Sequence, residues 1–419
     1  MASLTENNAA ASNSGKQKVY RMEGSYMSHM FKLSGRIDSV NAGELEKTIF
    51  EAHEKEGELS IDAGELEYIS SAGLRVLLKL RKKQSKLEIL NVSNDVYEIL
   101  EVTGFTDLLE VKKRLRYVSV DNCELIGKGG NGSVYRISED EIIKVYTEKT
   151  PVESIENEQK LARSAFVAGV PTAIAYDMVK TESGYGLVFE MVKADVIARK
   201  FMEEPENFDE YAKKYAELFK TIHSVSIEGK GLPSTKSIYL SYLDQLNGWY
   251  DDGEISRLRW FIEEIPDRNT MVHGDFHTNN IMVQGDELLI IDMAEISYGN
   301  PIYDLASSYY AHVLNPRQDP ESVMRYLNVT PEIAMKLWEV IMKDYFQTDD
   351  RETIERFNKT IEGFCLLKAA LIPAIWVNMP DEHKKRSVQA AKEYLFPQME
   401  ALLSGLDELS ASFAQNTEV

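Results

Sequence analysis

Residues 271–295 read MVHGDFHTNNIMVQGDELLIIDMAE, and this stretch contains two short apolar runs. The runs, Ile281–Val283 and Leu288–Ile291, are separated by a Gln-Gly-Asp-Glu segment that is typical of a tight turn. Two apolar runs around such a turn predict a β-hairpin, in which Val283 lies opposite Leu288.

Folding this hairpin brings three polar residues together at one end. Asn280 precedes the first strand, Asp292 follows the second, and Asp275 is on the loop that leads into the first strand. A kinase active site needs this set: an aspartate for the acceptor hydroxyl, and an asparagine and an aspartate that hold Mg²⁺. An ordinary surface hairpin with polar ends is the alternative for this stretch taken alone.

The length and composition favour an ordinary globular protein. The 419 residues predict two to three domains, and 43% hydrophobic with 27% charged residues is typical of soluble chains. Residues 1–17 lack the apolar core of a secretory signal and predict a disordered tail. The two cysteines, Cys123 and Cys365, are far apart and indicate a reducing compartment. We expect a cytoplasmic, bacterial protein without a membrane partner.

The negative charge is concentrated after the first hundred residues. The net charge is −21; residues 1–118 carry 17 basic and 18 acidic side chains, so the rest carries 30 and 50. An acidic body would repel phosphates, so we expect no nucleic-acid partner. It is compatible with a cationic substrate, although solubility also explains such charge.

Strand-like and helix-like patterns alternate over residues 18–113 and predict a small α/β layer. The expected strands are 18–23, 29–38, 59–61 with 68–69, 86–92 and 108–111, and the expected helices are 42–56, 71–84 and 94–104. The basic run at 112–117 is expected to be a solvated linker edge.

Two segments of this layer, LSGRIDSVNAGEL (33–45) and IDAGELEYISSAGLRVLL (61–78), resemble the STAS domain of anti-sigma-factor antagonists. The resemblance implies a phosphorylation site at Ser71, and an anti-sigma-factor-like or STAS protein as partner. Ser70 stands where the family often has an acidic residue. A purely structural role for Ser71, as the N-cap of the helix that follows, is the alternative.

The next unit begins with ELIGKGGNGSVYRI (124–137), in which Gly127, Gly129 and Gly132 form a G-x-G-x-x-G pattern, with Val134 following. A Rossmann loop is the rival interpretation, but it would lead into a helix. Here two β-prone runs follow, so the pattern favours a strand–loop–strand hairpin over nucleotide phosphates. Lys144, in the second run, is placed to reach the α- and β-phosphates.

A helix after Pro151 and a later strand complete the expected nucleotide site. Either Glu156 or Glu158 of the helix can pair with the strand lysine. The apolar segment 186–192 predicts a strand whose end, near Glu190 and Val192, offers backbone groups to an adenine edge.

The segment HGDFHTNN (273–280) resembles the signature of the aminoglycoside phosphotransferase and choline kinase superfamily, and the likeness extends over about residues 119–310. It implies a protein kinase-like fold, with an N-lobe at 114–193 and a largely helical C-lobe at 194–419. It also implies ATP and Mg²⁺ as cofactors, Asp275 as catalytic base, Asn280 and Asp292 as metal ligands, and Lys144 at the phosphates. The resemblance further implies that Glu158, rather than Glu156, pairs with Lys144, and that Asp304 braces the catalytic loop.

The acceptor is expected to be small. Only twelve positions separate Asp292 from Asp304, which leaves no room for a long activation segment. Helices are expected at 320–327, 331–346, 353–372 and 383–403, where Trp338, Tyr345 and Trp376 either hold an ammonium by cation–π contact or belong to the core. The sequence thus predicts an α/β plus α+β protein that phosphorylates a hydroxyl of a small molecule under STAS control. A signalling kinase acting on a STAS serine and a non-catalytic scaffold are the alternatives.

Overall fold

The chain folds into two units, residues 1–117 and 118–419. The structure, a computed structural model, describes residues 20–25, 28–129, 132–226, 232–377 and 379–413. The expected tail at 1–17 lies outside these residues. None of the described helices is long and apolar enough to cross a membrane.

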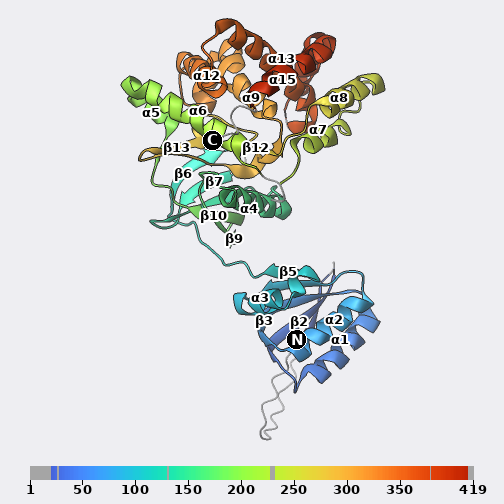
Figure 1. The fold of residues 1–419 in the computed structure, drawn as a ribbon. Coiled ribbons are helices and arrows are strands. Elements are labelled where there is room, and N and C mark those ends of the chain that lie inside the picture. Colours follow the sequence, from blue (N-terminus) through green and yellow to red (C-terminus); the bar gives the residue numbers. More distant parts are fainter. Residues whose placement is uncertain (1–19, 26–27, 130–131, 227–231, 378, 414–419) are drawn as a thin grey trace, which may run out of the picture. The chain divides into compact units, whose positions relative to one another are not determined.

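The first unit is a five-stranded sheet with three α-helices, which confirms the expected α/β layer (Figure 1). The sheet order is β1-β2-β3-β4-β5; β1 and β2 are antiparallel and the other pairs are parallel. The strands are β1 (Tyr20–Ser25), β2 (Ser28–Ile37), β3 (Leu59–Ile69), β4 (Glu88–Val92) and β5 (Glu110–Lys113), and the helices are α1 (Ala42–Glu56), α2 (Ser71–Lys83) and α3 (Asn94–Val102), with the short 3₁₀ helix η1 (Phe105–Asp107).

Helix α2 packs tightly on the sheet at its first turn. A Cβ at Gly73 would meet side-chain carbons of Ile37 and Ile69 at 2.6 and 2.7 Å, so only glycine fits there. The alternative in which Ser71 caps this helix does not hold: the N-cap is Ser70, and Ser71 is the first helical residue, exposed to solvent. The Ser70 backbone is extended, as a cap requires, although its hydroxyl makes no capping hydrogen bond.

The second unit begins with an antiparallel sheet of order β6-β7-β8-β10-β9, covered by α4 (Figure 1). Its elements are β6 (Glu124–Gly129), β7 (Gly132–Arg136), β8 (Glu141–Tyr146), α4 (Val152–Val167), β9 (Ala175–Thr181) and β10 (Gly184–Glu190). The glycine pattern therefore joins two strands and not a strand and a helix. Pro151, expected in the first turn of α4, is its N-cap.

The remainder of this unit is mainly helical around two small sheets, β11-β13-β14 and β12-β15. The strands are β11 (Asp195–Val196), β12 (Thr270–Val272), β13 (Ile281–Gln284), β14 (Glu287–Ile290) and β15 (Ser297–Gly299). The helices are α5 (Ile197–Glu203), α6 (Phe208–Ser224), α7 (Thr235–Leu243), α8 (Asp252–Glu264), α9 (Ile302–Tyr309), α10 (Asn315–Gln318), α11 (Pro320–Tyr326), α12 (Pro331–Phe346), α13 (Arg351–Ile375), α14 (Asp381–Ala390) and α15 (Met399–Phe413). Short 3₁₀ or π turns are η2 (Pro205–Asn207), η3 (Thr278–Asn280), η4 (Met293–Glu295), η5 (Tyr310–Leu314), η6 (Ala391–Leu395) and η7 (Phe396–Gln398).

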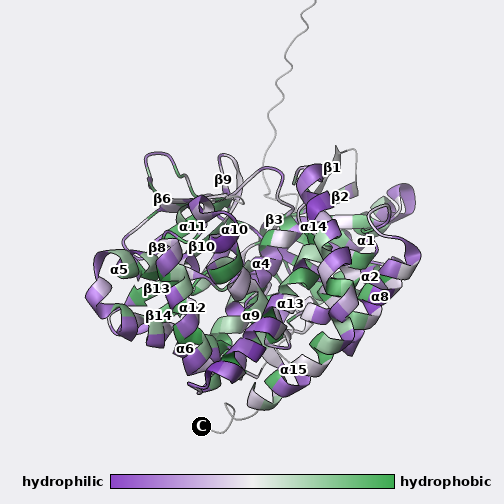
Figure 2. Cartoon of the chain, turned by 90° about the horizontal axis from the view of Figure 1, so that it is seen from above, coloured by the Kyte–Doolittle hydropathy of each residue, from purple (hydrophilic) through white to green (hydrophobic). Residues whose placement is uncertain are grey.

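The helices of the second unit carry both apolar and polar residues, as helices around a core must (Figure 2). The single helix expected at 383–403 is wrong, because the chain there passes from α14 through η6 and η7 into α15. Pro397 lies in η7 and lacks the N–H that a continuous α-helix would need.

Of the two alternatives for the aromatic residues of the C-terminal helices, the structure supports core packing for Trp338 and Tyr345. Trp338 and Tyr345 are 3% and 2% exposed, so both belong to the core. The Trp338 indole donates to Asn358 Oδ1 at 2.9 Å, and the Tyr345 hydroxyl lies 2.7 Å from His223 Nδ1. Only Trp376 of the three is substantially exposed.

Candidate active site

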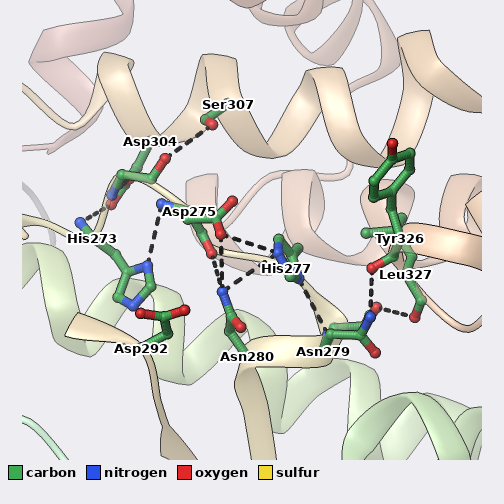
Figure 3. A network of polar contacts seen from close by, with 12 residues as sticks. His273, Asp275, His277, Asn279, Asn280, Asp292, Asp304, Ser307, Tyr326 and Leu327 are labelled. Carbon is green, nitrogen blue, oxygen red and sulfur yellow. Dashed lines mark hydrogen bonds and ion pairs between the residues drawn. The ribbon is translucent and has the colours of Figure 1, made fainter. Parts of the chain in front are cut away.

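The hairpin forms in the expected register and places Asp275 beside Asn280 (Figure 3). Val283 pairs with Leu288, and the Ile291 amide donates to the Asn280 carbonyl at 2.8 Å. The Asn280 amide nitrogen donates to the backbone carbonyl of Asp275 at 2.9 Å and to its Oδ2 at 3.2 Å. Since the nitrogen is used in this way, the Asn280 Oδ1 is left as an acceptor.

The loop that carries Asp275 is held in place by an aromatic side chain and a buried carboxylate. Phe276 is 1% exposed and stacks on Phe219 of α6, with ring centroids 4.2 Å apart. Asp304, at the start of α9, is fully buried and accepts from the amides of His273 and Gly274 at 2.7 and 2.6 Å. The expected bracing by Asp304 is therefore present in the structure.

Two further side chains extend this brace. His223 of α6 bridges the core, with Nε2 at 3.1 Å from Asp304 Oδ2 and Nδ1 at 2.7 Å from the Tyr345 hydroxyl. His273 accepts the Asp275 amide on Nδ1 at 3.2 Å, and burial lowers its pKa, so the imidazole is neutral. Both histidines thus contact the residues that support the loop.

The charge of Asp275 is set by its neighbours. Burial alone would raise the pKa of this carboxyl. The His277 Nε2 lies 3.2 Å from Asp275 Oδ2, and this hydrogen bond lowers the pKa. The charges of His277, His273 and Lys368 lower it further. Together these contacts outweigh burial and hold the pKa of Asp275 well below its usual range. Asp275 is therefore ionised at neutral pH and able to orient a hydroxyl.

Asp292 faces Lys144 of β8 in the second unit. Lys144 Nζ lies 2.7 Å from Glu158 Oε1 of α4 and 3.3 Å from Asp292 Oδ1. Burial by itself would lower the pKa of Lys144, but the carboxylates of Asp292 and Glu158 raise it above its usual value. Glu158 is buried whereas Glu156 is only half-buried, and no ion pair of Glu156 occurs among the described residues. The sequence-predicted choice of Glu158 as partner of the lysine agrees with this geometry.

The glycine-rich hairpin lies over the strand that carries Lys144. Gly129 pairs with Gly132, Gly127 with Val134, and Val134 in turn with Lys144. Gly132 approaches β8 so closely that a Cβ there would overlap the Val145 carbonyl oxygen. The two positions between Gly129 and Gly132 lie outside the described residues.

The expected adenine-binding segment is at the end of β10. Glu190 pairs with Glu141 of β8, its amide donates to the Ile174 carbonyl at 2.9 Å, and Met191 donates to the Asp140 carbonyl at 2.8 Å. The Val192 carbonyl accepts from Ala194 at 3.0 Å. The chain thus leaves the sheet at Glu190 and turns directly at Val192.

Three residues beside Asp275 were not identified from the sequence. Lys368 of α13 donates to Ser307 Oγ of α9 at 3.0 Å and to the Gly274 carbonyl at 3.4 Å, and the Ser307 hydroxyl donates to the same carbonyl at 3.2 Å. Glu295 lies next to Gly274. The backbone of Gly274 has a φ of +85°, which favours glycine, and a Cβ on this residue would lie 2.9 Å from the Cβ of Glu295. No local pattern marks these residues, since helix packing alone brings them to the loop.

The charge of Glu295 also depends on this environment. Although the side chain reaches solvent, desolvation by the surrounding protein raises its pKa, with Asp275 and Asp292 adding to the rise and Lys368 opposing it. The carboxylates of Glu295, Asp275 and Asp292 would stabilise an additional positive group beside them.

The polar groups fit a magnesium–nucleotide complex. Asp292 is 44% exposed at its side chain and Asn280 presents its free amide oxygen, so both are suitable oxygen ligands. No cluster of three or more His, Cys, Asp or Glu that could hold a metal occurs in the described part of the chain. Mg²⁺ suits such a site because it takes few protein ligands and completes its shell with phosphates and water.

Residues 122–335 match the model of the phosphotransferase enzyme family, and residues 21–117 match that of the STAS domain. The STAS unit is similar to the anti-sigma-B factor antagonists of Listeria monocytogenes and Listeria innocua, each 33% identical over 85 residues, which is 19% of this chain and 75% of each relative.

The chain is also similar to solved structures, which include the following two. One is the streptomycin–ATP ternary complex of APH(2'')-IIa, at 15% identity, covering 66% of this chain and 93% of that chain with a TM-score of 0.43. The other is a choline/ethanolamine kinase family protein from Mesorhizobium loti, at 17% identity, covering 68% of this chain and 91% of that chain with a TM-score of 0.41.

Proposed function

The chain belongs to the phosphotransferase enzyme family and carries an N-terminal STAS domain, and on that premise we propose that it is an ATP- and Mg²⁺-dependent kinase for a hydroxyl of a small molecule. The observation that carries this proposal is the convergence of Lys144, Glu158 and Asp292 within 3.3 Å, next to a hairpin that joins Asn280 to Asp275 at 3.2 Å. These groups come from two regions that are distant in sequence, β8 with α4 and the β13–β14 hairpin with the loop before it.

The roles follow from position and charge. Lys144, kept charged by two carboxylates, would bind the α- and β-phosphates under the glycine hairpin, while the backbone near Glu190 and Val192 would meet the adenine edge. Asn280 and Asp292 would hold Mg²⁺, which neutralises phosphate charge during transfer.

On the acceptor side, Asp275 would hold the attacking hydroxyl and take its proton as the new oxygen–phosphorus bond forms. Its low pKa suits orientation of the hydroxyl more than early proton removal. Lys368 and Ser307 fix the Gly274 carbonyl just before it, so the aspartate is held in a rigid loop.

One feature of the structure supports a small acceptor, and a second feature supports a cationic one. The connection from Asp292 to Asp304 contains only η4, β15 and the start of α9, so it offers no platform for a peptide. Glu295 places a carboxylate beside Asp275, which favours an acceptor that carries a cationic group.

The test is ATP turnover by the full chain over a broad set of small alcohols, amino alcohols and amino sugars. We expect one class to stimulate turnover, with the activity removed in Asp275→Asn and retained in Asp286→Asn, a fully exposed aspartate in the turn of the same hairpin. Binding of Mg-ATP without turnover of any acceptor would contradict the small-molecule proposal.

A second candidate is a signalling kinase that phosphorylates a STAS serine. It is favoured by the exposure of Ser71 in the first turn of α2, where a phosphate would be stabilised by the helix amides, and by the likeness of this domain to anti-sigma-B factor antagonists. Mass spectrometry after incubation with labelled ATP tests it, with Ser71→Ala as control. An unlabelled Ser71 in a chain that binds ATP would exclude self-phosphorylation. A non-catalytic scaffold is the least favoured alternative, because it gives the ionised Asp275 no role.

A further inference from the structure

Tyr146 lies next to Lys144, which is expected to bind the nucleotide phosphates, and no sequence pattern assigns it a function. It follows Lys144 by two positions on β8, so both side chains are on the same face of the sheet. The Lys144 ammonium is 5.3 Å from the centroid of the Tyr146 ring. Tyr146 also pairs across the sheet with Gly132, at the end of the glycine hairpin. The tyrosine is therefore next to the lysine on its own strand and next to the glycine hairpin on the neighbouring strand.

The hydroxyl of this tyrosine is buried without a hydrogen-bond partner. Tyr146 is 4% exposed, and its oxygen contacts no donor or acceptor in hydrogen-bonding geometry within the described residues. Burial, first, and the nearby Glu158 carboxylate raise the pKa of the phenol, so the hydroxyl keeps its proton and remains a donor. Burying a hydroxyl without a partner is costly, and phenylalanine would fill the same space without that cost.

No contact of this hydroxyl meets hydrogen-bond geometry among the described residues. Besides burial, the Glu158 carboxylate is close enough to raise the pKa of the phenol by its charge and by hydrogen bonding, but Lys144 already binds its Oε1 at 2.7 Å. A hydroxyl donor beside a glycine hairpin and a lysine that would bind phosphates is suited to an anionic oxygen.

We propose that the Tyr146 hydroxyl donates a hydrogen bond to a phosphate oxygen of the bound nucleotide, as a second phosphate-binding side chain beside Lys144. This inference rests on the proposed function, since it requires that the second unit binds a nucleoside triphosphate. It assigns to Tyr146 a role that depends on the phosphates and not on the base.

The test compares Tyr146→Phe with the wild-type full chain by calorimetric titration with Mg²⁺ and a non-hydrolysable ATP analogue, and separately with adenosine. We expect the affinity for the triphosphate to fall about tenfold, as loss of one hydrogen bond to a charged group predicts. We expect affinity for adenosine to be unchanged. The melting temperature of the nucleotide-free variant should be equal to or above that of the wild type, because an unpaired buried hydroxyl has been removed.

The matched control is Tyr303→Phe. Tyr303 of α9 is also buried, at 6% exposure, and its hydroxyl also has no partner among the described residues. This variant should bind both ligands as the wild type does. The four tryptophans, at positions 249, 260, 338 and 376, all lie in the second unit, so their fluorescence follows the unfolding of that unit alone.

Each outcome separates the inference from the proposed function. If the wild type binds the analogue and Tyr146→Phe binds it equally well, the inference fails while the kinase proposal stands. If the variant melts at a lower temperature with unchanged affinity, the hydroxyl serves Glu158 in the free protein, and the inference is again wrong. If the wild type binds no triphosphate, the proposed function fails first.

Discussion

Replacing Asp304 by asparagine is expected to loosen the catalytic loop and to destabilise the second unit. The carboxylate is fully buried and accepts three hydrogen bonds, from the amides of His273 and Gly274 at 2.7 and 2.6 Å and from His223 at 3.1 Å. Asparagine has the same shape but only one acceptor oxygen, and its NH₂ group would face a donor.

The magnitude follows from those contacts. Hydrogen bonds to a charged group contribute about 1.5–3 kcal/mol each, and a buried donor without a partner costs about 1–3 kcal/mol. One lost bond and one unpaired donor give about 2.5–6 kcal/mol, a range that includes the cost of about 3–5 kcal/mol for breaking a buried ion pair. Burial alone would raise the pKa of Asp304, but His223 and the His273 amide lower it below the usual value. The deficit should therefore be full at pH 7 and shrink only as the pH falls below about 4.

The assay is equilibrium unfolding in urea followed by tryptophan fluorescence, which reports the second unit because all four tryptophans lie there. Asp286→Asn is the control, since this aspartate in the β13–β14 turn is fully exposed; its free energy of unfolding should change by less than about 0.5 kcal/mol. If Asp304→Asn unfolds within about 1 kcal/mol of the wild type, the brace does not hold the loop as argued here.

Three further substitutions test the nucleotide side and the base. Glu158→Gln should weaken triphosphate binding about tenfold because the lysine loses its buried ion pair, whereas Glu156→Gln on the same helix should not; equal losses measured by titration would contradict the pairing. His277→Asn should raise the pKa of Asp275 and move the acidic limb of the pH profile of ATP turnover to higher pH, and an unmoved limb would count against the assigned hydrogen bond. Gly132→Ala should lower nucleotide affinity by forcing β7 away from β8, which calorimetry would detect, and wild-type affinity would show that the hairpin tolerates a Cβ.

Most of the helices and strands could be predicted from local sequence patterns. Helices 42–56 and 331–346 occur with the expected bounds, and the hairpin forms with Val283 opposite Leu288. Periodicity and turn chemistry act over a few residues, so they can be read along the chain. The same locality explains the errors: Ser71 and Ser70 are equally good caps by composition, and only the backbone at Ser70 distinguishes them.

The chemistry of the candidate site divides in the same way. Asp275, Asn280 and Asp292 were recognisable because a single hairpin joins them, and hairpin geometry follows from their spacing. Lys368 and Tyr345 could not be assigned, because the packing of whole helices decides whether a side chain reaches the loop or enters the core. Burial and the cost of unpaired polar groups are properties of the folded chain as a whole. For that reason the sequence indicated Asp275, Asn280 and Asp292, and only the fold showed that Lys368, Ser307 and Glu295 lie beside them.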